Sequence, residues 1–151
     1  MTDKVKSIPD GYPTVTPYLT VNGAAAAIEF YRRAFGATEI MRLEHQGRIG
    51  HAEIKIGDSP IMLADEFPEM GARGPHDGSP VSMLLYVEDV DAVVVRAVAA
   101  GAKLQRPVAD QFYGDRTGTV EDPFGHFWHV ATHVEDMSPE ELQRRAAERF
   151  S

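Results

Sequence analysis

The sequence of 151 residues contains no cysteine. This absence excludes disulfide bonds, thiolate metal sites and cysteine nucleophiles, and it is compatible with a reducing compartment. Hydrophobic residues make up 43% of the chain, an ordinary fraction for a globular protein. A chain of this length can therefore be stabilised by a hydrophobic core alone.

Long apolar runs and basic clusters are also lacking. No stretch approaches the roughly 20 apolar residues of a membrane-spanning helix, and residues 1–6 lack the apolar core of a signal peptide. The formal net charge is −8, and the 15 Lys and Arg residues form no basic stripe. We therefore expect a cytoplasmic protein that has a small-molecule ligand as its partner, with no nucleic acid and no membrane.

Familiar catalytic signatures are missing as well. The sequence shows no Ser-His-Asp arrangement, no glycine-rich phosphate loop and no paired carboxylates at helical spacing. The function has to be sought in the repeated pattern that the chain does contain.

That pattern is strand, helix, strand, strand, strand, and it occurs twice. The alternating segment 15–21 is matched by 81–87, and the helix ending at Gly36 is matched by one ending at Gly101. The string Gly-His-Ala-Glu at 50–53 is echoed by Gly-Thr-Val-Glu at 118–121. The nearly constant spacing indicates an internal duplication.

The chain is therefore predicted to be an α+β protein made of two βαβββ modules with a C-terminal helix. Each module is too small to bury both faces of its sheet, so we expect it to pair with its copy, within one chain or between chains. The predicted parts are a flexible N-terminal tail at 1–11, the first module at 12–66, a linker loop at 67–80, the second module at 81–134 and the C-terminal helix at 135–151.

The C-terminal helix begins with a capping box, Ser138-Pro139-Glu140-Glu141. Leu142, Ala146 and Phe150 give the helix a narrow apolar stripe. Such a stripe can dock on the same domain or on a second subunit, which favours a homodimer.

The last part of the second module reads as a β-hairpin. Residues 116–121 and 127–132 form the two strands, and Asp122-Pro123-Phe124-Gly125 forms the turn. Alternation places Trp128 and Val130 on one face and His129 on the other, with Phe127 and Ala131. One face is predicted to be core and the other the wall of a cavity.

This hairpin resembles the last hairpin of the vicinal oxygen chelate superfamily, which includes glyoxalase I, extradiol dioxygenases and the bleomycin and fosfomycin resistance proteins. The strings Gly114-Asp115-Arg116 and Glu121-Asp122-Pro123-Phe124-Gly125-His126, with Trp128 and Ala131-Thr132-His133, are most similar to the PhnB-like, glyoxalase/bleomycin resistance-like branch. The resemblance covers roughly residues 12–133. It implies the glyoxalase/bleomycin resistance/dihydroxybiphenyl dioxygenase-like fold, in which paired modules curve their sheets around a cavity.

Metal-using members of this superfamily take ligands from the first and fourth strand of each module. Carried over residue by residue, these positions fall on Thr16 and Ser82 and on Met62 and His129. Of the four, only His129 is a strong ligand. The resemblance therefore implies that the usual metal site is absent, and no cofactor is favoured.

A rearranged divalent metal site is the alternative. His51 and Glu53 share one face of the third strand, and together with His129 they could hold Zn²⁺, Mn²⁺ or Fe²⁺. The chain would then be a metal-dependent lyase, isomerase or dioxygenase. Glu53 or Glu121 could instead act as a general base without a metal, so Glu53, Glu121 and His129 are the catalytic candidates. The interpretation that we favour over this metal site is that His51 and Glu53 are solvated or hydrogen-bonded residues of the sheet.

Aromatic and basic residues complete the predicted ligand-binding set. Tyr18 and Tyr86 occupy matching positions on the two first strands, where they either line the cavity or cap a core. Tyr113 and Arg116 bracket Gly114 and could clamp an anion; alternatively, Arg116 forms a salt bridge to an acidic residue nearby, Asp115, Glu121 or Asp122. The full set is Thr16, Tyr18, His51, Glu53, Met62, Ser82, Tyr86, Tyr113, Arg116 and His129.

Three functions remain open at this point. The first is a binding protein that sequesters a small molecule without changing it. The second is the metal-dependent or metal-free enzyme described above. The third is an interaction module whose cavity is vestigial, which only the charged C-terminal helix supports.

Overall fold

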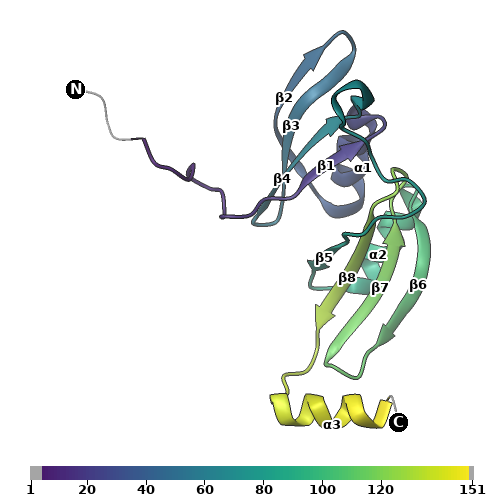
Figure 1. Cartoon of the computed structure of the whole chain (residues 1–151). Helices are drawn as coiled ribbons and strands as arrows, with labels where there is room; N and C mark the ends of the chain where they lie inside the picture. The colour runs from purple at the N-terminus through teal and green to yellow at the C-terminus, as the bar shows by residue number, and fades with distance from the viewer. Residues whose placement is uncertain (1–4, 150–151) are drawn as a thin grey trace. The chain divides into compact units, whose positions relative to one another are not determined.

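The structure is a computed structural model that describes residues 5–149 (Figure 1). The chain divides into two compact units, the first ending at Pro75 and the second beginning at His76. Each unit contains a four-stranded mixed sheet and one helix in the order βαβββ, and a further helix follows in the second unit. The predicted α+β fold of two βαβββ modules with a C-terminal helix is confirmed. Part of the predicted tail, residues 1–4, lies outside the described residues.

Unit 1 has the strand order β1-β4-β3-β2, in which only β1 and β4 are parallel. Its elements are β1 (Tyr18–Val21), α1 (Ala24–Phe35), β2 (Thr38–His45), β3 (Arg48–Ile56) and β4 (Ser59–Asp65), followed by the short 3₁₀ helix η1 (Pro68–Met70). β1 is shorter than the alternating segment predicted because Pro17 has no N–H to donate to a sheet.

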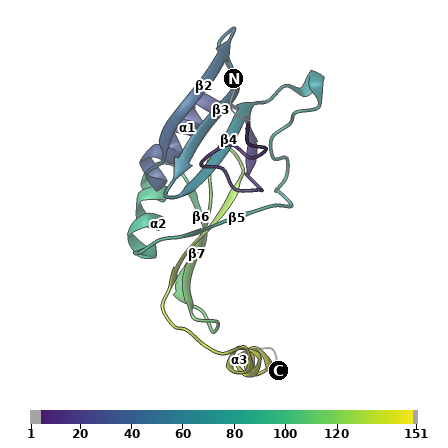
Figure 2. The same ribbon diagram turned by 90° about the vertical axis from the view of Figure 1, so that its left-hand side faces the viewer.

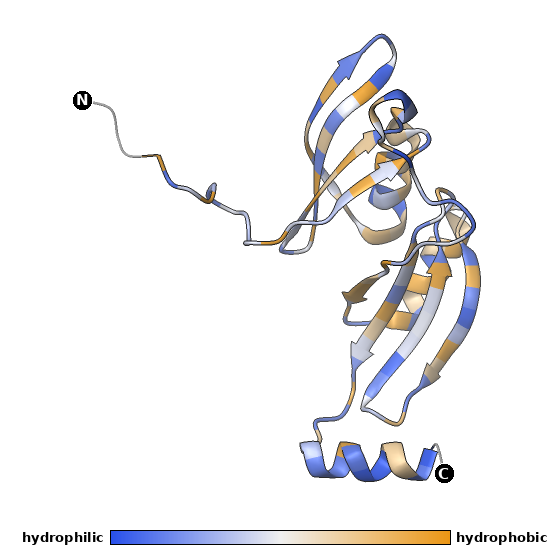
Figure 3. Cartoon of the chain, viewed as in Figure 1, coloured by the Kyte–Doolittle hydropathy of each residue, from blue (hydrophilic) through white to orange (hydrophobic). Residues whose placement is uncertain are grey.

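α1 packs on one face of this sheet (Figures 1 and 2). Its apolar residues recur at helical spacing, and the buried set is Ala24, Ala27, Ile28, Phe30, Tyr31 and Ala34. They meet the alternate strand residues that are buried, among them Val21, Ala52, Ile54 and Leu63. The alternation of apolar and polar residues along the strands is visible in Figure 3. The core of unit 1 therefore lies between α1 and the sheet.

The start of α1 is capped by Asp65, a residue distant in sequence that is in register with Val21 on the sheet. The Asp65 carboxylate, at the end of β4, accepts hydrogen bonds from the backbone N–H groups of Gly23 (2.9 Å), Ala24 (2.8 Å) and Ile49 (2.8 Å). Burial raises the pKa of Asp65, but these three donors outweigh it and hold that pKa below its usual value. Asp65 thereby joins the helix, β3 and β4.

Unit 2 repeats this arrangement with the strand order β5-β8-β7-β6. Its elements are β5 (Met83–Tyr86), α2 (Val90–Ala99), β6 (Lys103–Asp110), β7 (Asp115–Glu121) and β8 (Phe127–His133). α2 is capped by Asp89, whose side chain accepts from the N–H of Ala92 (3.1 Å). Thr132 on β8 accepts from the N–H of Val90 (2.9 Å) and so performs the role that Asp65 has in unit 1.

The β7–β8 hairpin is held by the buried carboxylate of Asp122. One oxygen accepts from the N–H groups of Phe124 (2.9 Å) and His126 (3.0 Å), and the other accepts from the indole N–H of Trp128 (3.0 Å). Trp128 is only 2% exposed. One carboxylate therefore shapes the turn and fixes the largest core side chain of unit 2.

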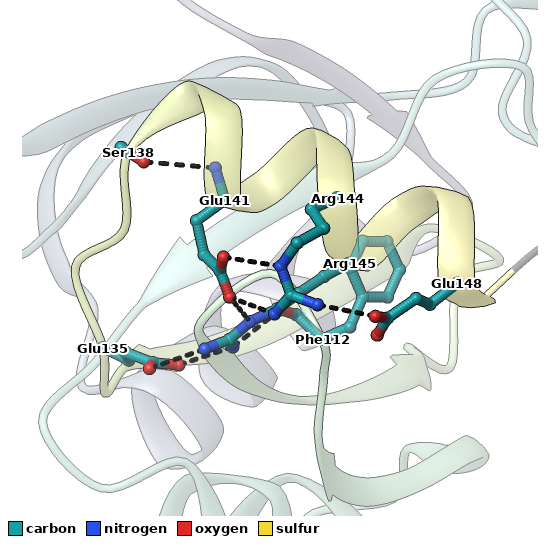
Figure 4. Close-up of polar contacts among 7 residues, drawn as sticks. All are labelled: Phe112, Glu135, Ser138, Glu141, Arg144, Arg145 and Glu148. Carbon is teal, nitrogen blue, oxygen red and sulfur yellow. Dashed lines mark hydrogen bonds and ion pairs between the residues drawn. The ribbon is translucent and has the colours of Figure 1, made fainter.

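The C-terminal helix, α3 (Pro139–Arg149), begins with Ser138 as predicted, since its hydroxyl accepts from the N–H of Glu141 (3.1 Å). Phe150, the last residue of the predicted stripe, lies outside the described residues. Arg145 donates to the Phe112 carbonyl (3.2 Å) and to both oxygens of Glu135 (2.8 and 2.9 Å), as Figure 4 shows. α3 is thus held to the rest of unit 2 by polar contacts, and none of its described residues is buried.

Within residues 5–149, no helix is long and apolar enough to cross a membrane.

Candidate functional site

Each sheet has a face opposite its helix, called here the open face. Strand residues alternate, so the residues on the open faces are the ones that the helices do not bury. Register places four side chains in a row across the open face of unit 1 and four across that of unit 2. The first row is Tyr18, Met62, Glu53 and Met41, and the second is Leu84, His129, Thr119 and Arg106.

On the open face of unit 1, three polar side chains form a chain of hydrogen bonds. The hydroxyl of Tyr18 lies 2.8 Å from Nδ1 of His51, and Nε2 of His51 lies 2.9 Å from Oε2 of Glu53. Glu53 and His51 are partly buried, with side-chain exposures of 16% and 27%. Burial raises the pKa of Tyr18, which keeps the phenol protonated. The phenol then donates to Nδ1, and Nε2–H donates to the carboxylate.

On the open face of unit 2, the imidazole of His129 lies between two hydroxyls. Nδ1 is 2.8 Å from the hydroxyl of Thr119, and Nε2 is 3.1 Å from that of Ser82. A hydroxyl can donate or accept, so this pair stabilises either neutral tautomer of the ring. His129 can therefore offer a ligand a donor or an acceptor.

His129 lies in the wall of a cavity of about 470 Å³ in unit 2. This volume is in the range of small-molecule sites. The rings of Phe112 and Tyr113 meet edge to face in its lining, with centroids 5.2 Å apart. The lining residues are Leu84, Arg106, Pro107, Gln111, Phe112, Tyr113, Thr117, Thr119, His129 and Arg149.

The two tyrosines predicted to match do not match. Tyr18 is in register with Met62, whereas the residue in register with His129 is Leu84, and Tyr86 is in register with Ala131. The matched segments 15–21 and 81–87 pair Tyr18 with Leu84, so the match of Tyr18 with Tyr86 was two residues out of that alignment. A shift of two keeps every side chain on its face, so alternation alone cannot detect it.

Tyr86 belongs to a separate polar group at the end of the open face. Its hydroxyl donates to Oδ2 of Asp115 (2.8 Å), while Oδ1 of Asp115 lies 2.8 Å from Nδ1 of His133. His133 also contacts Asp136 through Nε2 (2.7 Å). The Asp115 carboxylate raises the pKa of Tyr86.

Arg116 is bound to acidic residues other than those expected. It donates from Nε and Nη2 to the two oxygens of Asp91 on α2 (2.8 and 3.0 Å) and from Nη1 to Asp110 (3.2 Å). The hydrogen bond from Arg116 lowers the pKa of Asp91. Arg116 therefore ties β7 to α2 and is not part of the cavity lining, whereas Tyr113 is.

The remaining predicted residues are distributed as follows. Thr16 and Ser82 each precede the first strand of their unit, and Ser82 reaches His129. Met62 lies beside Glu53 and Tyr18 in register. Glu121 ends β7 opposite Lys103 and Phe127, outside the cavity lining.

The donors for a metal are too few within either unit. Among residues 5–149, no three His, Asp or Glu side chains are grouped closely enough to hold an ion. In unit 1, His51 and Glu53 are bonded to each other, and the fourth-strand position carries the thioether of Met62. The four-ligand set of the superfamily does not fit these residues. The set of His129, His51 and Glu53 draws on both units and stays a prediction.

Sequence reasoning missed most of the cavity lining, namely Leu84, Arg106, Pro107, Gln111, Phe112, Thr117, Thr119 and Arg149. Arg106 lies between two irregularities in the β6–β7 register. Pro107, next to it, is the one sequence signal for such an irregularity in a strand.

Comparison with known proteins gives one family. The model of the Glyoxalase/Bleomycin resistance protein/Dioxygenase superfamily matches residues 13–130. The uncharacterized protein Mb0911c of Mycobacterium bovis is 40% identical over 137 residues, which are 87% of this chain and 90% of that protein.

Solved structures agree with this result. The gene product At5g48480 of Arabidopsis thaliana is 29% identical, with a TM-score of 0.65 over 80% of this chain and 98% of that one. TioX from Micromonospora sp. ML1 is 25% identical, with a TM-score of 0.62 over 83% of this chain and 100% of that one.

Proposed function

Because the chain belongs to the glyoxalase/bleomycin resistance protein/dioxygenase superfamily, we propose that it binds a small molecule in the cavity on the open face of unit 2. The observation that supports this most directly is the cavity of about 470 Å³ whose wall carries His129 between the hydroxyls of Ser82 and Thr119. Polar groups that converge on a hollow with apolar and aromatic walls are typical of ligand sites.

The lining favours a small amphipathic ligand. Leu84, Phe112 and Tyr113 offer apolar and aromatic surface, and His129 with Thr119 offers hydrogen bonds on the sheet. Both ring nitrogens of His129 are held by hydroxyls, and a ligand that replaces the exposed Ser82 contact can meet either a donor or an acceptor at Nε2. We propose that binding needs no metal, since Met62 and Ser82 stand at positions where metal-using relatives have ligands.

The resemblance to the PhnB-like branch extends this proposal to assembly. We propose a homodimer, which light scattering of the purified protein tests against the chain mass of 16.6 kDa. A mass of one chain contradicts it.

A second function is favoured by one specific observation, the hydrogen-bonded chain Tyr18–His51–Glu53 on the open face of unit 1. A carboxylate held in place by an imidazole and a phenol can accept a proton from a bound substrate and become neutral. This arrangement suits an enzyme in which Glu53 is the general base. Turnover that Glu53→Gln abolishes would favour this function over ligand binding. Stoichiometric metal in the purified protein would also favour an enzyme over a binding protein.

The binding proposal is tested by NMR titration with three probes of similar shape: benzamide, benzoate and benzylammonium. We expect at least one of them to shift the Leu84 methyl and His129 ring signals saturably. His129→Ala should weaken that binding several-fold, because a hydrogen-bonding group of the wall is lost. His45→Ala, at the exposed end of β2, is the control and should change nothing. The proposal fails if no probe shifts these signals.

A further inference from the structure

Arg106 is placed on the open face of unit 2 by an irregular stretch of β6. The β6–β7 register shifts between Leu104 and Arg106 and again between Arg106 and Ala109. Between these shifts Arg106 is opposite Thr119, which is opposite His129 on β8. Bulges of this kind redirect side chains, and here they add an arginine to the row that crosses the cavity wall.

Gly118 makes room for this irregular stretch. A Cβ atom at Gly118 would lie 2.8 Å from Cγ2 of Val108 and 3.4 Å from the carbonyl oxygen of Arg106. Any side chain at this position would therefore push β6 away from β7. The glycine is explained by close approach of the two strands.

The charge of the cavity is opposite to that of the protein. The chain carries a net charge of −8, yet the lining contains Arg106 and Arg149 and no Asp or Glu. Arg42, Arg116 and Arg145 are each bonded to carboxylates. By contrast, the side chains of Arg106 and Arg149 form no hydrogen bond or ion pair with another residue in 5–149.

We infer that this cavity takes an organic anion. Its carboxylate or phosphonate group is received by Arg106 and Arg149, and its apolar body lies against Leu84 and the rings of Phe112 and Tyr113. This inference rests on the proposed function and adds the chemical class of the ligand.

The arginines favour an anion because a guanidinium matches it in both charge and geometry. A guanidinium binds a carboxylate or phosphonate through two parallel hydrogen bonds, which are stronger than bonds between neutral groups. Two cations that share a cavity without a counter-charge repel each other, and an anion removes that repulsion. His129 can add a donor from the sheet, because either tautomer is available to it.

The test compares benzoate and phenylphosphonate with benzamide, which keeps the ring and loses the charge. Affinities are measured by NMR titration at low salt for the wild type, Arg106→Gln and Arg106→Lys. We expect at least one anion to bind about tenfold tighter than benzamide, because charge-assisted hydrogen bonds are stronger than those between neutral groups. Preference for benzoate identifies a planar carboxylate as the favoured head group, and preference for phenylphosphonate identifies a tetrahedral one.

In Arg106→Gln the preference for the anion should disappear while the affinity for benzamide stays within about twofold. Arg106→Lys should restore part of it. Arg73→Gln is the matched control, because Arg73 is an exposed arginine of unit 1 without a partner among the described residues. Each variant is first checked for an unchanged melting temperature.

Two failures can be told apart. If benzamide and the anions shift the Leu84 and His129 signals with equal affinity, or if the preference survives in Arg106→Gln, the anion inference is overturned and the binding site stands. If none of the probes shifts those signals, the proposed function itself fails.

Discussion

Nδ1 of His133 lies 2.8 Å from Oδ1 of the buried Asp115, across the end of the β7–β8 pair. The same imidazole reaches Asp136 through Nε2 (2.7 Å). The hydrogen bond with Asp115, followed by that with Asp136, raises the pKa of His133 above its ordinary value of about 6.5. Protonation of His133 therefore strengthens its contacts with Asp115 and with Asp136, which lies in the segment that leads to α3.

The first prediction concerns pH. A raised folded-state pKa means that the stabilisation from His133 is fully present below the unfolded-state pKa of about 6.5 and is lost as pH rises through the folded-state pKa. His133→Gln should therefore lower the free energy of unfolding more at roughly pH 5 than at roughly pH 8. Urea denaturation at both pH values measures this. An equal loss at both would show that His133 does not titrate in this way.

The second prediction concerns Asp65. Asp65→Asn keeps one oxygen acceptor but cannot accept from all three N–H groups, so a buried donor loses its partner. We expect a loss of about 1–3 kcal/mol at neutral pH. Because the folded-state pKa of Asp65 is lowered, this stabilisation is present above the unfolded-state pKa and disappears as pH falls through the folded-state value. Asp58→Asn, at an exposed turn, is the control in the same denaturation experiment.

The third prediction concerns Gly118. Gly118→Ala should destabilise the protein by roughly 1–3 kcal/mol through overpacking against Val108, and it should weaken ligand binding by displacing Arg106. Gly50→Ala is the control, because a Cβ at Gly50 meets nothing within 4 Å. Thermal unfolding of both variants gives the comparison. Equal stability of the two would contradict the close approach of β6 and β7.

The fourth prediction concerns His51. The carboxylate of Glu53 can only accept, so the neutral ring should carry its proton on Nε2. Long-range ¹H–¹⁵N NMR reads this tautomer directly. In Glu53→Gln the amide can donate or accept, and a mixture of tautomers is expected. A proton on Nδ1 in the wild type would argue against the hydrogen-bonded chain from Tyr18 to Glu53.

The fifth prediction concerns the attachment of α3. Arg145 reaches Glu135 and the Phe112 carbonyl outside the helix, whereas Arg144 bonds only Glu141 and Glu148 on the helix itself (Figure 4). Arg145→Ala should speed the amide exchange of residues 139–149 several-fold, because the hydrogen bonds that dock the helix are lost. Arg144→Ala should leave the exchange close to that of the wild type. Equal acceleration in both variants would mean that the helix is not held by Arg145.

The fold was predictable because its signals are local and repeated. Apolar spacing placed the helices, and alternation put Trp128 and Val130 on one face, which is buried in the structure. The match of segments 15–21 and 81–87 pairs Tyr18 with Leu84, as the register does. Tyr18 was instead matched to Tyr86, two residues further on, and alternation cannot detect this slip because both positions lie on the same face. Where register decides which residues are neighbours, pattern alone is insufficient.

The site was less predictable for a related reason. Arg116 binds Asp91, which precedes it by 25 residues and lies on another element, so no local pattern connects them. Arg106 joins the cavity wall only because of two shifts in register, which have no fixed sequence signature. Such contacts depend on tertiary packing and not on spacing along the chain.

The parallel pairing of β1 with β4 has a consequence for synthesis on the ribosome. β4 lies between β1 and β3, and its last residue, Asp65, also caps α1. The first strand of unit 1 therefore lacks its sheet partner, and α1 lacks its Asp65 cap, until the last strand of that unit has left the exit tunnel. Unit 1 is completed late in its own translation, through contacts between residues distant in sequence, and such contacts form slowly. During that interval β1 is an unpaired strand, and unpaired strands expose the nascent chain to aggregation.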